Sequence, residues 1–119
     1  MQAYAIDLAD KLKQFDQRWA PRTVALFNGH DVMVAKIEGS YTWHAHADSD
    51  DFFYVLKGRL FLDLPDGVTV QLDPGQLYVV PRGVQHRPRT EEEVHILLIE
   101  ASGTPNSGDP ATAAPRRLL

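Results

Sequence analysis

Residues 39–58 read GSYTWHAHADSDDFFYVLKG, a segment in which two histidines stand two positions apart and are followed by a pair of aspartates. On an extended strand, residues i and i+2 project to the same side, so His44 and His46 are expected to point together. Asp51 begins the next apolar run on the parity of an inward-facing row, whereas Asp50 would face the other way and is the alternative. The segment therefore predicts a cluster of two imidazoles and one carboxylate.

A further histidine follows in residues 75–90, which read GQLYVVPRGVQHRPRT and place His86 beyond a Pro-Arg-Gly turn. Three imidazoles and a carboxylate are a ligand set for non-haem iron, manganese, nickel or zinc. Such a set leaves one or two positions open on a six-coordinate ion, as in a reactive site rather than a closed structural one. The chain has five histidines and no cysteine, so histidine and carboxylate must carry any metal chemistry. Disulfides, thiolate nucleophiles, iron–sulfur clusters and cysteine-ligated zinc fingers are excluded.

The chain divides into three parts on its sequence pattern. Residues 23–101 alternate short Val-, Leu-, Ile- and Phe-rich runs with turn signals, giving about eight strands with no room for helices between them. This favours an all-β domain, an antiparallel sandwich or barrel. Residues 1–22 are expected to form an amphipathic helix over 5–19 and a linker. Residues 102–119 are a Pro-, Gly- and Ala-rich tail, either disordered or laid along the surface.

The two histidine segments together resemble the cupin superfamily. Its first motif is Gly, five residues, His-x-His, three or four residues, Glu, six residues, Gly; here His44-x-His46, Asp51 and Gly58 follow it. Its second motif is Gly, five residues, Pro-x-Gly, two residues, His, three residues, Asn, which the segment from Gly75 to His86 follows. The 16 residues between the motifs match the short spacer of small bacterial members.

Three positions depart from the family pattern. Gly39 precedes the first histidine by four residues instead of five, and Thr90 stands where Asn closes the second motif. Asp51 stands where Glu is usual, and its side chain is one methylene shorter. The carboxylate would therefore ligate only if its strand lies closer to the ion, or it would act through a water molecule.

The resemblance implies a small jelly-roll barrel of two packed antiparallel sheets, with a divalent first-row transition metal (Mn, Fe, Ni or Zn) in one mouth. It implies His44, His46, Asp51 and His86 as ligands, and it implies a homodimer. Two functions fit it. One is a metal-dependent oxygenase, isomerase or lyase whose small-molecule substrate chelates the ion. The other is a non-catalytic module that binds or senses metal and a small ligand.

Charge and hydropathy exclude several other classes of protein. The net charge is −4 without a basic stretch, which argues against a nucleic-acid partner. No apolar run approaches the roughly 20 residues that cross a bilayer, so no membrane partner is expected. Charged residues interrupt the first twenty positions, which argues against a signal peptide and favours a cytoplasmic protein.

The remaining polar residues are expected to have structural or solvent roles. By strand parity, Thr42 would line the pocket with His44, while Tyr41 and Trp43 would face away. Glu91–Glu93 are expected to form a solvated turn before a last strand over 94–100. Solvent exposure is expected for His30 and for the arginines near the second motif, and a place in the barrel wall for His95. The arginines are Arg82, Arg87 and Arg89, and the alternative for them is to hold an anion at the mouth.

Overall fold

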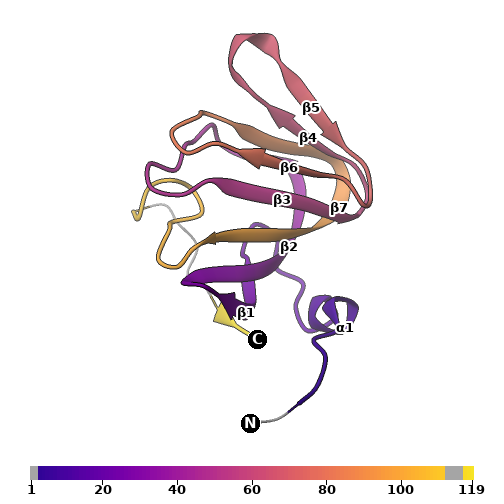
Figure 1. Cartoon of the computed structure of the whole chain (residues 1–119). Helices are drawn as coiled ribbons and strands as arrows, with labels where there is room; N and C mark the ends of the chain where they lie inside the picture. The colour runs from indigo at the N-terminus through magenta and orange to yellow at the C-terminus, as the bar shows by residue number, and fades with distance from the viewer. Residues whose placement is uncertain (1–2, 112–116) are drawn as a thin grey trace.

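The computed structural model describes residues 3–111 and 117–119, which form an antiparallel β-barrel with one short helix. Figure 1 shows β2 and β7 side by side across the middle, with β3 and β6 on one side of them and β1 and β8 on the other. The hydrogen-bonded order is β5-β4-β7-β2-β1-β8, while β3 pairs with β6 and β7. The all-β jelly-roll prediction is confirmed. The strands are β1 (Arg22–Phe27), β2 (His30–Ser40), β3 (Asp51–Lys57), β4 (Leu60–Asp63), β5 (Thr69–Leu72), β6 (Leu77–Val80), β7 (Arg87–Ala101) and β8 (Arg117–Leu118).

The interior is filled by alternate residues of the strands, as the period of two requires. In β3, every second residue from Asp51 to Val55 is buried, and in β7 the same alternation runs from Val94 to Glu100. Their side chains meet those of β2 and β4 in one apolar cluster. Its fully buried members include Met33, Val55, Leu60, Leu62 and Val94.

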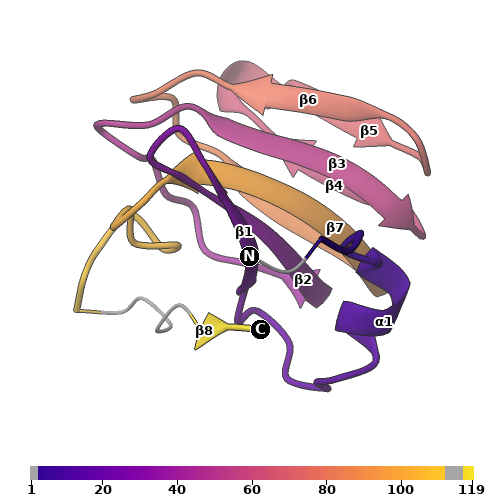
Figure 2. The same ribbon diagram turned by 60° about the horizontal axis from the view of Figure 1, so that its bottom comes forward.

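The N-terminal helix is much shorter than the apolar spacing predicts. Helix α1 spans Leu8–Leu12 instead of 5–19, with the Asp7 side chain accepting a hydrogen bond from the Asp10 amide at its start. Beyond it, the Lys36 ammonium donates to the Phe15 carbonyl at 2.6 Å, and the Trp19 amide donates to the Lys36 carbonyl at 2.9 Å. These bonds to β2 replace helical ones, so the prediction of a long helix was wrong. Figure 2 shows α1 beside β2 and the end of β7.

The expected turn at Glu91–Glu93 is also wrong, because β7 runs without interruption from Arg87 to Ala101. Its first residues pair with β4, and its later ones pair with β2 and β3. The Thr90 hydroxyl accepts a hydrogen bond from the Gly39 amide at 3.1 Å, where the register with β2 shifts. Glu91 and Glu92 are exposed, so they are solvated side chains of a strand.

The described parts of the C-terminal tail lie against the barrel. The Ser102 hydroxyl donates to Asp31 at 2.9 Å, and the Asn106 amide donates to the Trp19 carbonyl at 3.4 Å. Strand β8 adds to β1 in parallel, and the half-buried Leu119 packs on a second apolar cluster. Residues 112–116 of the predicted tail lie outside the described residues. No helix among the described residues is long and apolar enough to cross a membrane.

A buried carboxylate, Asp63, ties β4 to β7 and β5. It accepts hydrogen bonds from Arg87 at 2.8 and 3.1 Å, from Arg89 at 2.8 Å and from Thr69 at 2.9 Å. Burial would raise the pKa of Asp63, but these hydrogen bonds outweigh it and lower the pKa to about 2. Two of the three arginines near the second motif therefore hold this carboxylate.

Replacing Asp63 by asparagine should lower the free energy of unfolding by about 1–2 kcal/mol at pH 7. Because the folded pKa is depressed, this stabilisation is present above the unfolded pKa of about 4 and is lost as the pH falls towards 2. Urea unfolding at pH 7 and pH 3 measures it, and the difference between wild type and variant should shrink at pH 3. In the control Asp73→Asn, which breaks the exposed pair with Arg59, the change should stay within about 0.5 kcal/mol. Equal effects of the two substitutions would contradict this account.

Candidate metal centre

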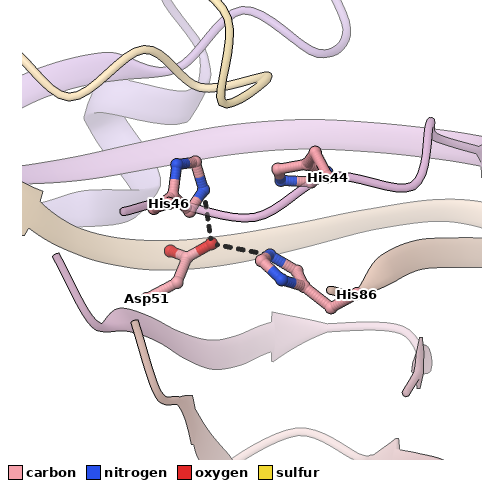
Figure 3. Close-up of side chains that lie close together, drawn as sticks. All are labelled: His44, His46, Asp51 and His86. Atoms are coloured by element: carbon pink, nitrogen blue, oxygen red, sulfur yellow. Dashed lines mark hydrogen bonds and ion pairs between the residues drawn. The ribbon is translucent and has the colours of Figure 1, made fainter. Parts of the chain in front are cut away.

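Four side chains from three separate parts of the chain meet inside the barrel (Figure 3). His44 and His46 come from the irregular segment between β2 and β3, Asp51 begins β3, and His86 precedes β7. One ligand atom of each residue lies within 4.8 Å of the other three. All four residues are buried, with exposures of 7%, 3%, 3% and 1%. Ligand atoms on one ion lie at most about 4.2 Å apart when each bond is about 2.1 Å, so the cluster is nearly at coordinating size.

Backbone hydrogen bonds between the two histidine segments bring the cluster together. The His44 amide donates to the His86 carbonyl at 3.0 Å, and the His86 amide donates back at 2.9 Å. The Gly83 amide donates to the His46 carbonyl at 2.8 Å. The turn at residues 81–83 thus holds His86 opposite the other two histidines, although no regular strand carries them.

Two of the rings are oriented through their outer nitrogens. His44 Nδ1 lies 2.9 Å from the Thr42 carbonyl, and His86 Nδ1 lies 3.0 Å from the Val84 carbonyl. A carbonyl only accepts, so each Nδ1 carries the proton, and each Nε2 of the neutral ring has a lone pair. Metal-binding histidines are held in this way, with the second nitrogen donating to a carbonyl.

Three buried polar atoms of His46 and Asp51 lack the partners that such groups normally have. Among the described residues, His46 Nδ1, His46 Nε2 and Asp51 Oδ1 are buried without a hydrogen bond. His46 Nε2 and His86 Nε2 each lie 3.2 Å from Asp51 Oδ2. A metal ion between these atoms would bind a neutral His86 through its Nε2 lone pair, with the ring proton on Nδ1. The donor set fits a divalent cation.

The protonation states of two residues suit a metal site at neutral pH. Burial lowers the pKa of His44 to about 4, with the neighbouring His86 and His46 adding to the effect against the hydrogen bond to Thr42. Burial alone would raise the pKa of Asp51, but the neighbouring His46 and His86 imidazoles and the Glu100 carboxyl group outweigh it and lower the pKa to about 2. His44 is therefore neutral and Asp51 ionised, the states that ligation requires.

Glu100 provides a second carboxyl group beside the cluster, and the sequence pattern did not predict it. Its Oε2 lies 3.2 Å from His46 Nε2, and the residue is 3% exposed. A signal was available, because Glu100 continues the inward row of Val94, Ile96 and Leu98 along β7. A glutamate in an apolar inward row indicates a buried partner or a site.

A pocket of about 430 Å³, counted to its open mouth, adjoins the cluster. His44, Asp51 and Glu100 form one part of its wall, and apolar side chains form much of the rest. Tyr41 lines it and its ring stands edge-on to His44, with centroids 5.3 Å apart, whereas Thr42 is exposed. The prediction that Thr42 and not Tyr41 faces the pocket was wrong, because strand parity does not apply to this irregular segment. Burial, followed by the charge of Glu100, raises the pKa of the Tyr41 hydroxyl.

The other candidate residues lie away from the four-residue cluster. Asp50 is exposed and accepts hydrogen bonds from the amide and guanidinium of Arg82, at 2.9 and 3.2 Å. His30 is exposed at the start of β2. His95 is a half-buried residue of β7 and lies 3.1 Å from the Glu93 carboxylate. Of the two aspartates considered, the structure brings Asp51 to the histidines.

The fold and the site together define a class, a small β-barrel with three histidines and a carboxylate gathered inside it. A family model for the cupin domain matches residues 31–100. The chain belongs to the cupin family. The uncharacterized protein YdbB of Bacillus subtilis (strain 168) is 33% identical over 93 residues, which are 78% of this chain and 80% of YdbB.

Solved structures and one enzyme family are also similar to parts of the chain. A cupin-2 domain containing protein from Shewanella frigidimarina is 40% identical, with a TM-score of 0.78 over 81% of this chain and 93% of that one. An acireductone dioxygenase from Phaeosphaeria nodorum is 30% identical over 67 residues. That match covers 53% of this chain but only 38% of the dioxygenase, so it compares the barrels and not the whole proteins.

Proposed function

We propose that the chain binds one divalent first-row transition metal, Mn, Fe, Ni or Zn, through His44, His46, Asp51 and His86. The ion would serve a metal-dependent enzyme of the oxygenase, isomerase or lyase class that acts on a small molecule in the adjoining pocket. The observation that carries this proposal is the convergence of four buried ligand atoms, from three histidines and one carboxylate, within 4.8 Å of one another. When bound, the ion supplies Lewis acidity, or redox chemistry in the case of iron.

The chain's own residues would prepare the site in three ways. The carbonyls of Thr42 and Val84 fix two imidazoles with their lone pairs inward. The ionised Asp51 offsets part of the charge of the ion. The apolar pocket wall excludes water and suits a small, partly apolar ligand. The similarity to an acireductone dioxygenase supports an enzymatic role over pure binding.

A pocket-filling variant tests whether small molecules bind beside the ion. Ala35 is 1% exposed and lines the pocket, so Ala35→Leu should fill part of it and weaken binding of catechol to the Co(II)-loaded protein at least fivefold. The visible absorption of Co(II) reports this binding, and the Co(II) content should stay unchanged. A matched control is Val68→Leu, an exposed substitution of similar type. Equal catechol affinity in all three proteins would contradict binding in this pocket. Turnover of a substrate would distinguish an enzyme from a module that only binds or senses its ligand.

Lengthening the carboxylate should preserve or strengthen metal binding. Asp51→Glu restores the residue usual in the family and extends the reach to the ion by one methylene. We expect a Kd for Mn(II) equal to or up to about tenfold lower than that of wild type, measured by competition with a fluorescent chelator. A clear loss of affinity would show that the carboxylate has a different role.

A further inference from the structure

Glu100 lies at the end of the inward row of β7 and is not one of the four predicted ligands. It is 3% exposed, in a row whose other members, Val94, Ile96 and Leu98, belong to the apolar core. A glutamate is almost never fully buried without a polar or charged partner. Its place at the wall of the metal pocket indicates that it serves the site and not the core.

The contacts of Glu100 are those of a neighbouring ligand. Its Oε2 lies 3.2 Å from His46 Nε2, the same distance that separates Asp51 Oδ2 from His46 Nε2 and from His86 Nε2. A hydrogen bond also joins the carboxyl groups of Glu100 and Asp51. Two adjacent ligand atoms on an octahedral ion lie about 3 Å apart when each bond is about 2.1 Å. The Glu100 oxygen is therefore at the spacing of an adjacent ligand from the His46 nitrogen, but it lies outside the group of four whose ligand atoms fall within 4.8 Å of one another. Its carboxylate would have to move towards the ion to bind it.

The net charge of the metal centre also favours Glu100 as a ligand. Two buried carboxylates in contact repel each other unless a proton or a cation is shared between them. One carboxylate leaves a divalent ion with a net charge of +1 in a buried site, whereas two carboxylates make the centre neutral.

We infer that Glu100 is a fifth metal ligand, so that the centre consists of three histidines and two carboxylates. The inference rests on the proposed metal site and adds a ligand from β7 to it. Five protein ligands exceed the four of a tetrahedral zinc site and favour six-coordinate Mn(II) or Fe(II). They leave one open position, so a substrate that binds the ion through two atoms would need one protein ligand to leave.

The test compares Mn(II) affinity in wild type, Glu100→Gln and the control Glu92→Gln, which alters an exposed residue of the same strand. Glutamine keeps the shape and the hydrogen-bonding ability but is a poor ligand. We expect a Kd at least tenfold higher for Glu100→Gln and an unchanged Kd for Glu92→Gln. The double variant Asp51→Glu with Glu100→Gln should recover most of the lost affinity. Its longer side chain at position 51 brings a carboxylate closer to the ion and compensates for the carboxylate lost at position 100.

The outcomes separate this inference from the proposed function. If wild type binds no metal, the proposed function fails. If wild type binds Mn(II) and Glu100→Gln binds it equally well, only the role of Glu100 is wrong. Thermal unfolding without metal checks the fold of each variant, and Glu100→Gln should melt close to the wild-type temperature, since glutamine keeps a hydrogen-bond donor beside Asp51. If that variant does not fold, Glu100→Asp keeps the charge but shortens the reach, and it should bind Mn(II) at least threefold more weakly; wild-type affinity would overturn the inference.

Discussion

Replacing His46 by alanine is expected to weaken the binding of Mn(II), Fe(II), Ni(II) or Zn(II) by at least a thousandfold, or about 4 kcal/mol. The reason is that His46 contacts both carboxyl groups of the cluster through Nε2, at 3.2 Å each, and is 3% exposed. Its removal opens the site and leaves the two acids without the imidazole between them. Isothermal titration with each metal measures the effect.

The matched control for this substitution is His30→Ala. His30 is exposed, its ring contacts the Asn28 carbonyl at a hairpin turn, and it is not among the residues of the cluster. The metal affinity of this variant should equal that of wild type. An unchanged metal content in His46→Ala would show that the site has been placed wrongly. Thermal unfolding of both variants without metal separates loss of ligation from loss of fold.

The second large effect is expected at Gly58, which closes the first motif. Its φ is +84°, and a Cβ built there would lie 2.9 Å from Val94 Cγ2 and 3.2 Å from the Glu93 carbonyl oxygen. Gly58→Ala therefore combines a left-handed backbone, at about 1–2 kcal/mol, with a clash against the buried β7. We expect the free energy of unfolding to fall by about 3 kcal/mol, measured by urea denaturation.

Gly67 provides a control in which only the backbone strain, and no steric clash, is expected. Its φ is +73°, but a Cβ there would meet nothing within 4 Å. Gly67→Ala should cost about 1 kcal/mol. If both alanine variants lose the same stability, the close approach of Gly58 to β7 does not limit this turn.

The cluster of histidines could be predicted because it depends on motif spacing. The intervals between His44, His46, Asp51 and His86 matched a known pattern, and the structure brings the four residues together. Strand parity predicted that His44 and His46 point to the same side of one strand, but the structure has no regular strand at these residues. Backbone bonds between the two loops, and not a regular strand, hold them.

The short helix and the position of Tyr41 could not be predicted from local pattern. The apolar spacing after Leu12 is helical, but Phe15 and Trp19 make their backbone bonds with Lys36 on β2. Such a tertiary contact overrides helix propensity and leaves no trace in a window of neighbouring residues. Tyr41 lies in a segment without strand pairing, where a period of two has no basis.

Glu100 shows a signal that was present but not used. The alternation along 94–100 predicts that Glu100 faces inward with Ile96 and Leu98. The sequence predicts a strand over 94–100, and the structure contains those residues within the longer β7. Motif spacing finds only residues inside the motifs, and Glu100 lies outside both of them.

The central claim is that the barrel holds one metal ion through its three histidines. Elemental analysis of protein purified without chelator, before and after reloading with Mn, Fe, Ni or Zn, tests it most directly. The account predicts close to one ion per chain for at least one of these metals and almost none in His46→Ala. Wild-type protein that contains no metal, and takes up none of the four after reloading, would contradict it.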